Sequence, residues 1–451
     1  MASISLKQAA AWCGGRIDEK YENVTFFGAN IDSRKLQPGQ LFVALVAARD
    51  GHDFIPGALE KGASAVLCNH ADGDFPAILV EDTRIALGQI AAGLLREMNP
   101  KIIGVTGSVG KSTTKEMIAA VVETEYKVSK TPANHNNDLG MPAAVLAMDA
   151  DSQVVVLEMG MSHFGEIAYL SNMAKPQIGV IINIGTMHIE NLGSQEGILQ
   201  AKLEITQGMA ADGKLILYGD DSYLWGSRDK LPVAAEYFGA ENENCAVKAK
   251  NVTESAEGIR YTACYAAGEF DVYLPLEGQH YVADSLAAIS VGLALGIAPE
   301  NIQKGLGNFR TMEGRQEIFE KKGCTIIKDC YNAGPESIEA ALKVLGNRNG
   351  RKIAVLGDML ELGSHSQAAH TKVGQLAKTY ADILLCYGSQ SAYMLQGAKD
   401  AGMMQAYHFM DQALLAKELK NIVRPGDVLL FKGSRGMKME NALELFLQEE
   451  I

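Results

Sequence analysis

The sequence has 451 residues, and this length predicts about three domains. Apolar residues make up 47% of the chain and charged residues 21%, which excludes a disordered, collagen-like or coiled-coil protein. With 41 Lys and Arg against 54 Asp and Glu, the net charge is -13, so the chain repels a polyanion and we expect no nucleic-acid partner.

Apolar strands and turn clusters divide the chain into three α/β parts. Residues 1–98 contain short predicted strands, such as 40–46 and 65–68, and indicate a small α/β domain. In residues 99–313, apolar strands alternate with helical segments, which indicates a mostly parallel sheet buried on both faces. The same alternation in residues 314–451 predicts a Rossmann-like domain, without the G-x-G-x-x-G of an independent dinucleotide site.

The apolar segments and the cysteines indicate the cellular compartment of the protein. The longest apolar run with helical character, residues 287–298, is shorter than the roughly 20 residues that cross a bilayer, so we expect no membrane insertion. No secretory signal is expected, because the N-terminus lacks a basic region followed by an apolar one. Seven cysteines form no C-x-x-C pair, and their odd number is typical of a reducing compartment. These features predict a cytoplasmic protein without structural zinc.

A glycine-rich loop follows the first strand of the predicted central domain, in the sequence GVTGSVGKST from Gly104 to Thr113. Glycines let backbone N–H groups approach phosphate oxygens, Lys111 can reach the outer phosphates, and Ser112 can bind magnesium. The loop departs from the strict G-x-x-x-x-G-K-[ST] spacing, because Val105 stands where the first glycine belongs. It predicts a nucleoside triphosphate site formed by Gly107, Ser108, Val109, Gly110, Lys111, Ser112 and Thr113.

Three further polar residues follow in chain order. Glu158 ends the strand VVVL at the edge where open α/β sheets bind ligands, and its carboxylate is placed to hold a phosphate-bound Mg²⁺. His188 follows the strand predicted at 179–184 and can be a metal ligand or a phosphate-side donor, although a lone histidine is more often structural. Lys202 falls on a predicted helix, where an exposed lysine is the ordinary expectation. The absence of N-K-x-D, H-E-x-x-H and G-x-S-x-G disfavours a GTPase, a zinc hydrolase and a serine hydrolase.

These motifs resemble those of a known family. GVTGSVGKST, VVVLEMG, NIGTMHIENLG and AKLEI occur in the order and approximate spacing seen in the Mur ligases, the ATP-dependent amide-forming enzymes of bacterial peptidoglycan synthesis. The resemblance covers the whole chain. DSRKLQPGQLFVAL and DGHDF resemble the part of these enzymes that binds a uridine nucleotide. DCYNAGPES and VLGDMLELG resemble the signature of the member that adds D-alanyl-D-alanine, whereas the D-N-P-R of the diamino-acid-adding relative is absent.

The resemblance implies that UDP-N-acetylmuramoyl-tripeptide is joined to D-alanyl-D-alanine through an acyl phosphate, with ATP and Mg²⁺. It implies that residues 1–98 bind the uridine-linked substrate, residues 99–313 bind ATP and residues 314–451 bind the incoming amine.

The resemblance also assigns roles to individual residues. Glu158 and His188 would serve Mg²⁺, and Lys202 would be a carbamylated lysine, against the ordinary expectation for it. Arg315 would approach the γ-phosphate and Asn332 would contact the nucleotide. Ser33 and Arg34 would lie beside the uridine nucleotide.

Two departures and three alternatives accompany this interpretation. Where the family commonly has G-x-H-N-x-x-N, this chain has Tyr281 and Asp284, and an ionised Asp only accepts hydrogen bonds. Gly334 stands where Asn is usual.

The alternatives are a P-loop conformational switch, a diamino-acid-adding ligase and a folylpolyglutamate-like ligase. The third residue of the accepted peptide, lysine or diaminopimelate, stays open.

Overall fold

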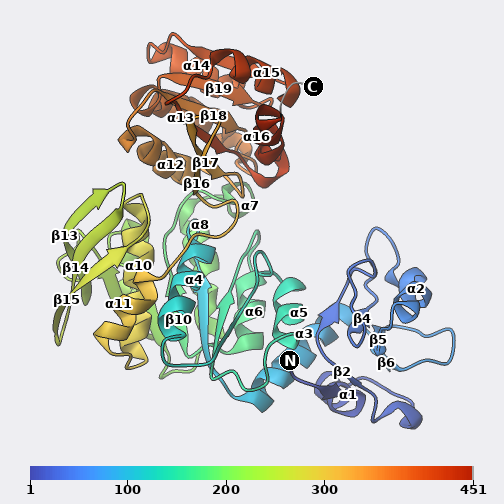
Figure 1. Ribbon diagram of the computed structural model, residues 1–451. Coiled ribbons are helices and arrows are strands. Elements are labelled where there is room, and N and C mark those ends of the chain that lie inside the picture. Colours follow the sequence, from blue (N-terminus) through green and yellow to red (C-terminus); the bar gives the residue numbers. More distant parts are fainter. Residues whose placement is uncertain (449–451) are drawn as a thin grey trace.

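Three α/β parts follow one another along the chain in the computed structural model, which describes residues 1–448 (Figure 1). In the view of Figure 1 the N-terminal part lies to the right of the central part, and the C-terminal part lies above it. This arrangement confirms the predicted α/β fold class with a central parallel sheet. No helix within residues 1–448 is long and apolar enough to cross a membrane.

The N-terminal part contains two small sheets. An antiparallel pair joins β1 to β2, and β3 to β6 form a parallel sheet in sequential order. β4 ends at Val43, three residues before the predicted end, because the chain turns back where the Ala47 N–H donates to the Arg49 carbonyl. The elements are β1 (Ile4–Ser5), α1 (Leu6–Cys13), β2 (Thr25–Phe26), β3 (Ala29–Asn30), β4 (Leu41–Val43), α2 (Ile55–Glu60), β5 (Ala65–Cys68), β6 (Ala77–Leu79) and α3 (Thr83–Met98).

The central sheet has the order β15-β14-β13-β12-β11-β10-β7-β9-β8. It is parallel from β8 to β13, whereas β13, β14 and β15 pair antiparallel. Its strands are β7 (Lys101–Thr106), β8 (Val128–Lys130), β9 (Val154–Glu158), β10 (Ile178–Ile181), β11 (Lys214–Tyr218), β12 (Ala234–Gly239), β13 (Val247–Ser255), β14 (Gly258–Tyr265) and β15 (Gly268–Leu274). Its helices are α4 (Lys111–Val122), α5 (Gly140–Leu146), α6 (Glu166–Ala174), α7 (Ile189–Leu192), α8 (Gln195–Leu203), α9 (Ser222–Gly226), α10 (His280–Ala294) and α11 (Pro299–Gly307).

Both faces of the parallel part of the central sheet are covered, as the continuous apolar strands predict. Along β7, Ile102 belongs to the core that α3, α5 and α6 complete, whereas Ile103 and Val105 belong to the core under α4, α10 and α11. The first of these cores continues into the N-terminal part, where it includes Ile4 and Leu41. Burial of this core therefore anchors the N-terminal part to the central sheet.

The C-terminal sheet has the order β16-β17-β21-β18-β19-β20, with all neighbours parallel except the hairpin β16–β17. Its elements are β16 (Glu317–Lys321), β17 (Cys324–Asp329), α12 (Pro335–Asn347), β18 (Lys352–Gly357), α13 (Ser366–Tyr380), β19 (Ile383–Tyr387), α14 (Ala392–Asp400), β20 (Ala406–Phe409), α15 (Gln412–Ile422), β21 (Val428–Lys432) and α16 (Met439–Leu447). Asp329 and Lys432 end adjacent strands, so polar groups gather at the carboxyl edge of this sheet, the edge at which such folds bind ligands.

Candidate active site

A cleft of about 1120 Å³ lies between the central and C-terminal sheets. Most of the residues predicted for the site line it, namely Ser108, Val109, Gly110, Lys111, Ser112, Thr113, Glu158, His188, Arg315 and Asn332. Gly107, Lys202, Ser33 and Arg34 do not line it. The fold therefore brings together residues from the carboxyl edges of two sheets, with the glycine-rich loop at the centre.

The glycine-rich loop joins β7 to α4, which begins at Lys111. Gly110 has a φ of +87°, and a Cβ there would lie 2.7 Å from Asp284 Oδ1, so both the backbone and the space require glycine. Asn183 holds the loop in place. Its Oδ1 accepts from the N–H groups of Ser108 and Val109 at 3.0 and 2.9 Å, and its Nδ2 donates to the Val109 carbonyl. Asn183 was not among the predicted residues.

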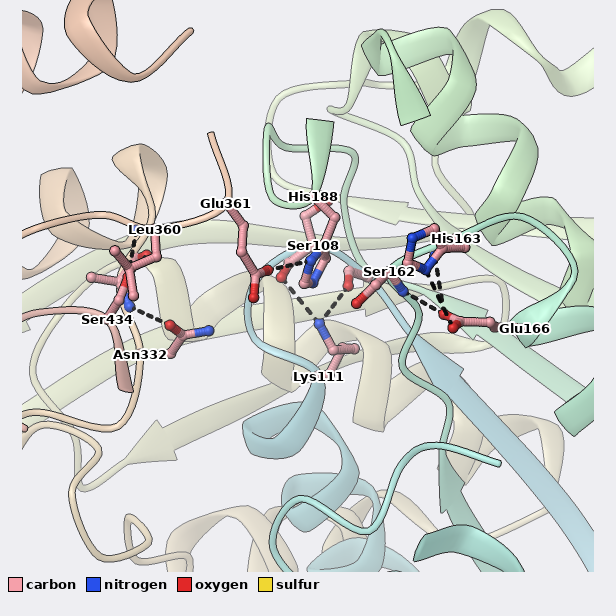
Figure 2. Close-up of polar contacts among 12 residues, drawn as sticks. Ser108, Lys111, Ser162, His163, Glu166, His188, Asn332, Leu360, Glu361 and Ser434 are labelled. Atoms are coloured by element: carbon pink, nitrogen blue, oxygen red, sulfur yellow. Dashed lines mark hydrogen bonds and ion pairs between the residues drawn. The ribbon is translucent and has the colours of Figure 1, made fainter. Parts of the chain in front are cut away.

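The side chain of Lys111 folds back over the glycine-rich loop. Its Nζ donates to the carbonyls of Gly107 and Ser108 at 2.8 and 3.1 Å. Figure 2 shows Lys111 beside Ser108. Burial lowers the pKa of Lys111, the Glu158 charge opposes this, and the Arg315 charge adds to it. No carboxylate within residues 1–448 forms an ion pair with Lys111, so its charge is left for an anionic ligand.

Glu158 lies at the end of β9 with only 2% of its surface exposed. Its Oε1 accepts from Asn136 Nδ2 at 2.8 Å, whereas its buried Oε2 has no hydrogen-bond partner among the described residues. A carboxylate oxygen without a donor, in the same cleft as the Ser112 hydroxyl, is a ligand that Mg²⁺ prefers. These residues fit a divalent cation. Sequence reasoning missed Asn136, although the asparagine cluster at 134–137 was a usable signal.

His188 connects the central part to the C-terminal part. It has a φ of +63°, and its Nδ1 lies 2.6 Å from Glu361 Oε2, an ion pair visible in Figure 2. The His188 ring beside it lowers the pKa of Glu361. Nearby, the N–H and hydroxyl of Thr186 both donate to Glu336 Oε1 at 2.9 Å. The loop after β10 is thus joined twice to the C-terminal part, by two glutamates that the sequence did not reveal as partners.

Lys202 lies in α8 and only 2% of its surface is exposed, so the ordinary expectation of an exposed lysine is wrong. Burial lowers its pKa well below the usual value, and the Lys111 charge lowers it further. Its Nζ makes no hydrogen bond or ion pair within residues 1–448. This environment favours the neutral amine over the ammonium.

Arg315 follows the segment that leads from the central to the C-terminal part. Its Nη2 donates to Ser112 Oγ at 2.8 Å, and its guanidinium lies 3.9 Å from the centroid of the Tyr331 ring. The arginine therefore reaches the first turn of α4 from the opposite side of the cleft.

We expect Arg315→Ala to lower turnover by roughly 100-fold or more while changing ATP affinity little, because the guanidinium can stabilise charge that develops during phosphoryl transfer. Turnover at saturation and titration with a non-hydrolysable ATP analogue separate the two effects. Arg310→Ala, at an arginine that donates to its own neighbour Phe309, is the control. A pure affinity defect with unchanged turnover would contradict this role.

Asn332 lies in the loop after β17. Its Oδ1 accepts from the Ala333 N–H at 2.9 Å, and its carbonyl accepts from Lys432 Nζ at 2.9 Å. Lys432 also donates to Asp329 Oδ2 at 2.6 Å. Lys432 and Asp329 line the cleft and were not among the predicted residues. The nucleotide contact of Asn332 stays a prediction.

Asp284, on α10, is buried and accepts from Thr114 Oγ1 at 2.7 Å. Burial raises the pKa of Asp284 to about 7, against the opposing effects of Thr114 and Arg315. Below that pH the carboxyl is mostly protonated and can donate as well as accept. This differs from the sequence expectation of an ionised, accept-only group, because the sequence did not show the burial.

We expect Asp284→Asn to stabilise the protein, with a gain that grows as pH rises. The folded-state pKa of about 7 exceeds the ordinary 3.8, so the folded state loses stability between these pH values and the loss is constant above them. The gain should reach a few kcal/mol at pH 8, at about 1.4 kcal/mol per pKa unit. Denaturant unfolding from pH 4 to pH 8 measures it, with the exposed Asp229→Asn as the control. A difference independent of pH would contradict the buried, protonated state.

Ser33 and Arg34 lie in the N-terminal part. The Ser33 carbonyl accepts from Lys61 Nζ at 3.0 Å, and the exposed Arg34 side chain pairs with Asp32 at 2.9 Å. The Arg34 hydrogen bond lowers the pKa of Asp32 to about 2. Neither residue lines the cleft, so their place beside a uridine nucleotide stays a prediction.

The glycine-rich loop lies on a parallel sheet and faces a Rossmann-like sheet across a shared cleft. This arrangement defines an α/β nucleotide-binding enzyme. Family models match three stretches of the chain: "Mur ligase family, catalytic domain" at 25–95, "Mur ligase middle domain" at 105–292, and "Mur ligase, glutamate ligase domain" at 314–435. The chain belongs to the Mur ligase family.

Similar proteins cover the whole chain. UDP-N-acetylmuramoyl-tripeptide--D-alanyl-D-alanine ligase of Bacillus subtilis is 38% identical over 100% of both chains, and that of Escherichia coli is 34% identical over 100% of this chain and 99% of its own. A crystal structure of MurF from Acinetobacter baumannii superposes with a TM-score of 0.92 at 31% identity over 100% of both chains. MurF ligase from Thermotoga maritima in complex with ADP gives 0.83 at 29% identity over 93% of this chain and 97% of its own.

Proposed function

We propose that this protein is an ATP-dependent ligase that joins UDP-N-acetylmuramoyl-tripeptide to D-alanyl-D-alanine in peptidoglycan synthesis. The observation that carries the proposal is the shared cleft, in which Arg315 of the C-terminal side reaches Ser112 of the glycine-rich loop at 2.8 Å. Full-length similarity to curated ligases of this activity supports the choice of substrates. The fold similarity to an ADP complex supports the use of ATP.

The reaction has two steps. The peptide carboxylate attacks the γ-phosphorus of ATP and ADP leaves, which gives an acyl phosphate. The dipeptide amine then attacks the acyl carbon and phosphate leaves. Positioning and charge neutralisation catalyse such a transfer, which fits Lys111 and Arg315 on either side of the cleft.

The cleft favours direct transfer over a covalent enzyme intermediate at cysteine. Cys330 lines the cleft, but burial raises the pKa of its thiol to about 12, so it is a poor nucleophile. Ser112 Oγ and Glu158 Oε2 would hold Mg²⁺, with His188 as a further candidate ligand. That ion would supply charge neutralisation on the phosphates.

In this proposal each of the three parts binds a different ligand. Residues 1–98, with Ser33 and Arg34, bind the uridine-linked substrate. Residues 99–313 bind ATP, and residues 314–451 bind the dipeptide, with Asn332 contacting the nucleotide. All seven cysteines are free, which supports the cytoplasm, where thiols stay reduced.

Phosphate release with one component omitted at a time tests the function. We expect release to require ATP, UDP-N-acetylmuramoyl-tripeptide and D-alanyl-D-alanine together, and mass spectrometry should detect the joined product. Peptides that end in lysine and in diaminopimelate are tested side by side. Equal release with ATP alone would favour a P-loop switch, and product formation only with a diamino acid or glutamate would favour one of the related ligases.

A further inference from the structure

A fully buried lysine with no assigned role lies next to the nucleotide loop. Lys115 is one turn along α4 from Lys111, and none of its surface is exposed. Burying an ammonium is costly unless it is paired and hydrogen-bonded. The residue therefore has partners that offset the free-energy cost of burying its charge, and these partners indicate what it does.

Lys115 makes three polar contacts. Its Nζ donates to the Thr131 carbonyl at 2.6 Å and lies 3.1 Å from Glu116 Oε1. It lies 3.7 Å from Glu158 Oε2, the carboxylate oxygen that has no hydrogen-bond partner among the described residues. At this distance the positive charge stabilises the carboxylate, but it does not form a close hydrogen bond with that oxygen.

Glu158 is held from its other sides. Its backbone N–H donates to Thr131 Oγ1 at 2.9 Å, and its Oε1 accepts from Asn136. Thr131 therefore contacts both Lys115 and Glu158, through its carbonyl and its hydroxyl. The result is an oriented carboxylate with one oxygen left without a donor among the described residues.

We propose that Lys115 is a positioning residue that keeps the Glu158 carboxylate oriented, so that Oε2 stays available to a divalent cation. The inference rests on the proposed function, in which Glu158 holds Mg²⁺ beside the nucleotide. Without the ammonium, the Glu158 carboxylate keeps a single side-chain partner, Asn136, and is free to turn toward another donor. Residues that orient a metal ligand typically change metal affinity roughly 10–100-fold when they are replaced.

Nucleotide binding with and without metal tests this role independently of turnover. Calorimetry measures the Kd of a non-hydrolysable ATP analogue in EDTA and in excess Mg²⁺. The Kd in EDTA divided by the Kd in Mg²⁺ reports how much the metal strengthens nucleotide binding. We expect Lys115→Met and Lys115→Gln to reduce this ratio about tenfold or more. The Kd in EDTA should stay unchanged, because Lys115 does not line the cleft.

Lys130→Met is the matched control. Lys130 pairs with the same Glu116, at 2.7 Å, and with Glu123, but not with Glu158, so its removal should leave the ratio unchanged. Lys115→Gln retains a donor for the Thr131 carbonyl, which lets it fold if Lys115→Met does not.

Each remaining outcome overturns a defined statement. Equal ratios in the wild-type protein and the Lys115 variants would overturn the positioning role alone. A wild-type ratio of one would remove the Mg²⁺ site from the proposed function, and this inference with it. Failure of both Lys115 variants to fold, monitored by circular dichroism, would assign Lys115 to stability and also overturn the inference.

Discussion

Lys111→Ala is expected to lower turnover by roughly 1,000-fold or more with little change in melting temperature. The ammonium is held over the glycine-rich loop by the carbonyls of Gly107 and Ser108, without a carboxylate partner, so its charge is available to the phosphates. Loss of a group that stabilises developing charge costs about 100- to 1,000-fold in turnover, and loss of ground-state phosphate binding adds to this. Steady-state phosphate release measures the effect.

The control for Lys111 is Lys127→Ala, which removes an exposed lysine that pairs with Asp151. It should retain wild-type turnover. Near-wild-type activity of Lys111→Ala at an unchanged melting temperature would show that this loop does not serve phosphoryl transfer.

The second large effect is expected at Lys202, which we propose to be N-carboxylated. Its buried site and the Lys111 charge lower its pKa and favour the neutral amine. A neutral amine adds CO₂ and releases a proton, which gives a carbamate whose oxygens suit a hard cation. The resulting anion would also compensate the Lys111 charge.

Lys202→Ala should therefore lose most of the activity, and acetate or formate should restore part of it by occupying the vacated space. Lys202→Arg should stay inactive, because arginine remains protonated in proteins. Turnover of the wild-type protein should fall when CO₂ and bicarbonate are removed and recover when they return. Lys230→Ala, at an exposed lysine, is the control. Wild-type turnover in both Lys202 variants would refute the carbamate.

Interactions between distant residues account for most of what sequence reasoning missed. Thr114 and Asp284 are 170 positions apart, and Ser112 and Arg315 are 203 apart, yet each pair is hydrogen-bonded. The resemblance placed Arg315 near the phosphates. The structure adds that its partner is Ser112, which no local pattern indicates.

The central sheet likewise has one part that the sequence predicted and another that it did not. A mostly parallel sheet was predicted, because apolar runs between helices are a local signal. The antiparallel strands β13, β14 and β15 were not predicted. They are half-exposed, since α10 and the neighbouring core cover one face, and they lack a continuous apolar run.

The sequence by itself determined the three α/β parts, the glycine-rich loop, Glu158 at a strand end and the Mur ligase family. These depend on apolar periodicity and on short motifs whose chemistry lies within a few adjacent residues. Only the tertiary structure decided the burial of Lys115 and Lys202, the protonation of Asp284 and the pairing of His188 with Glu361. Burial and the charge of a neighbour set these properties, and both arise when segments distant in the chain pack together.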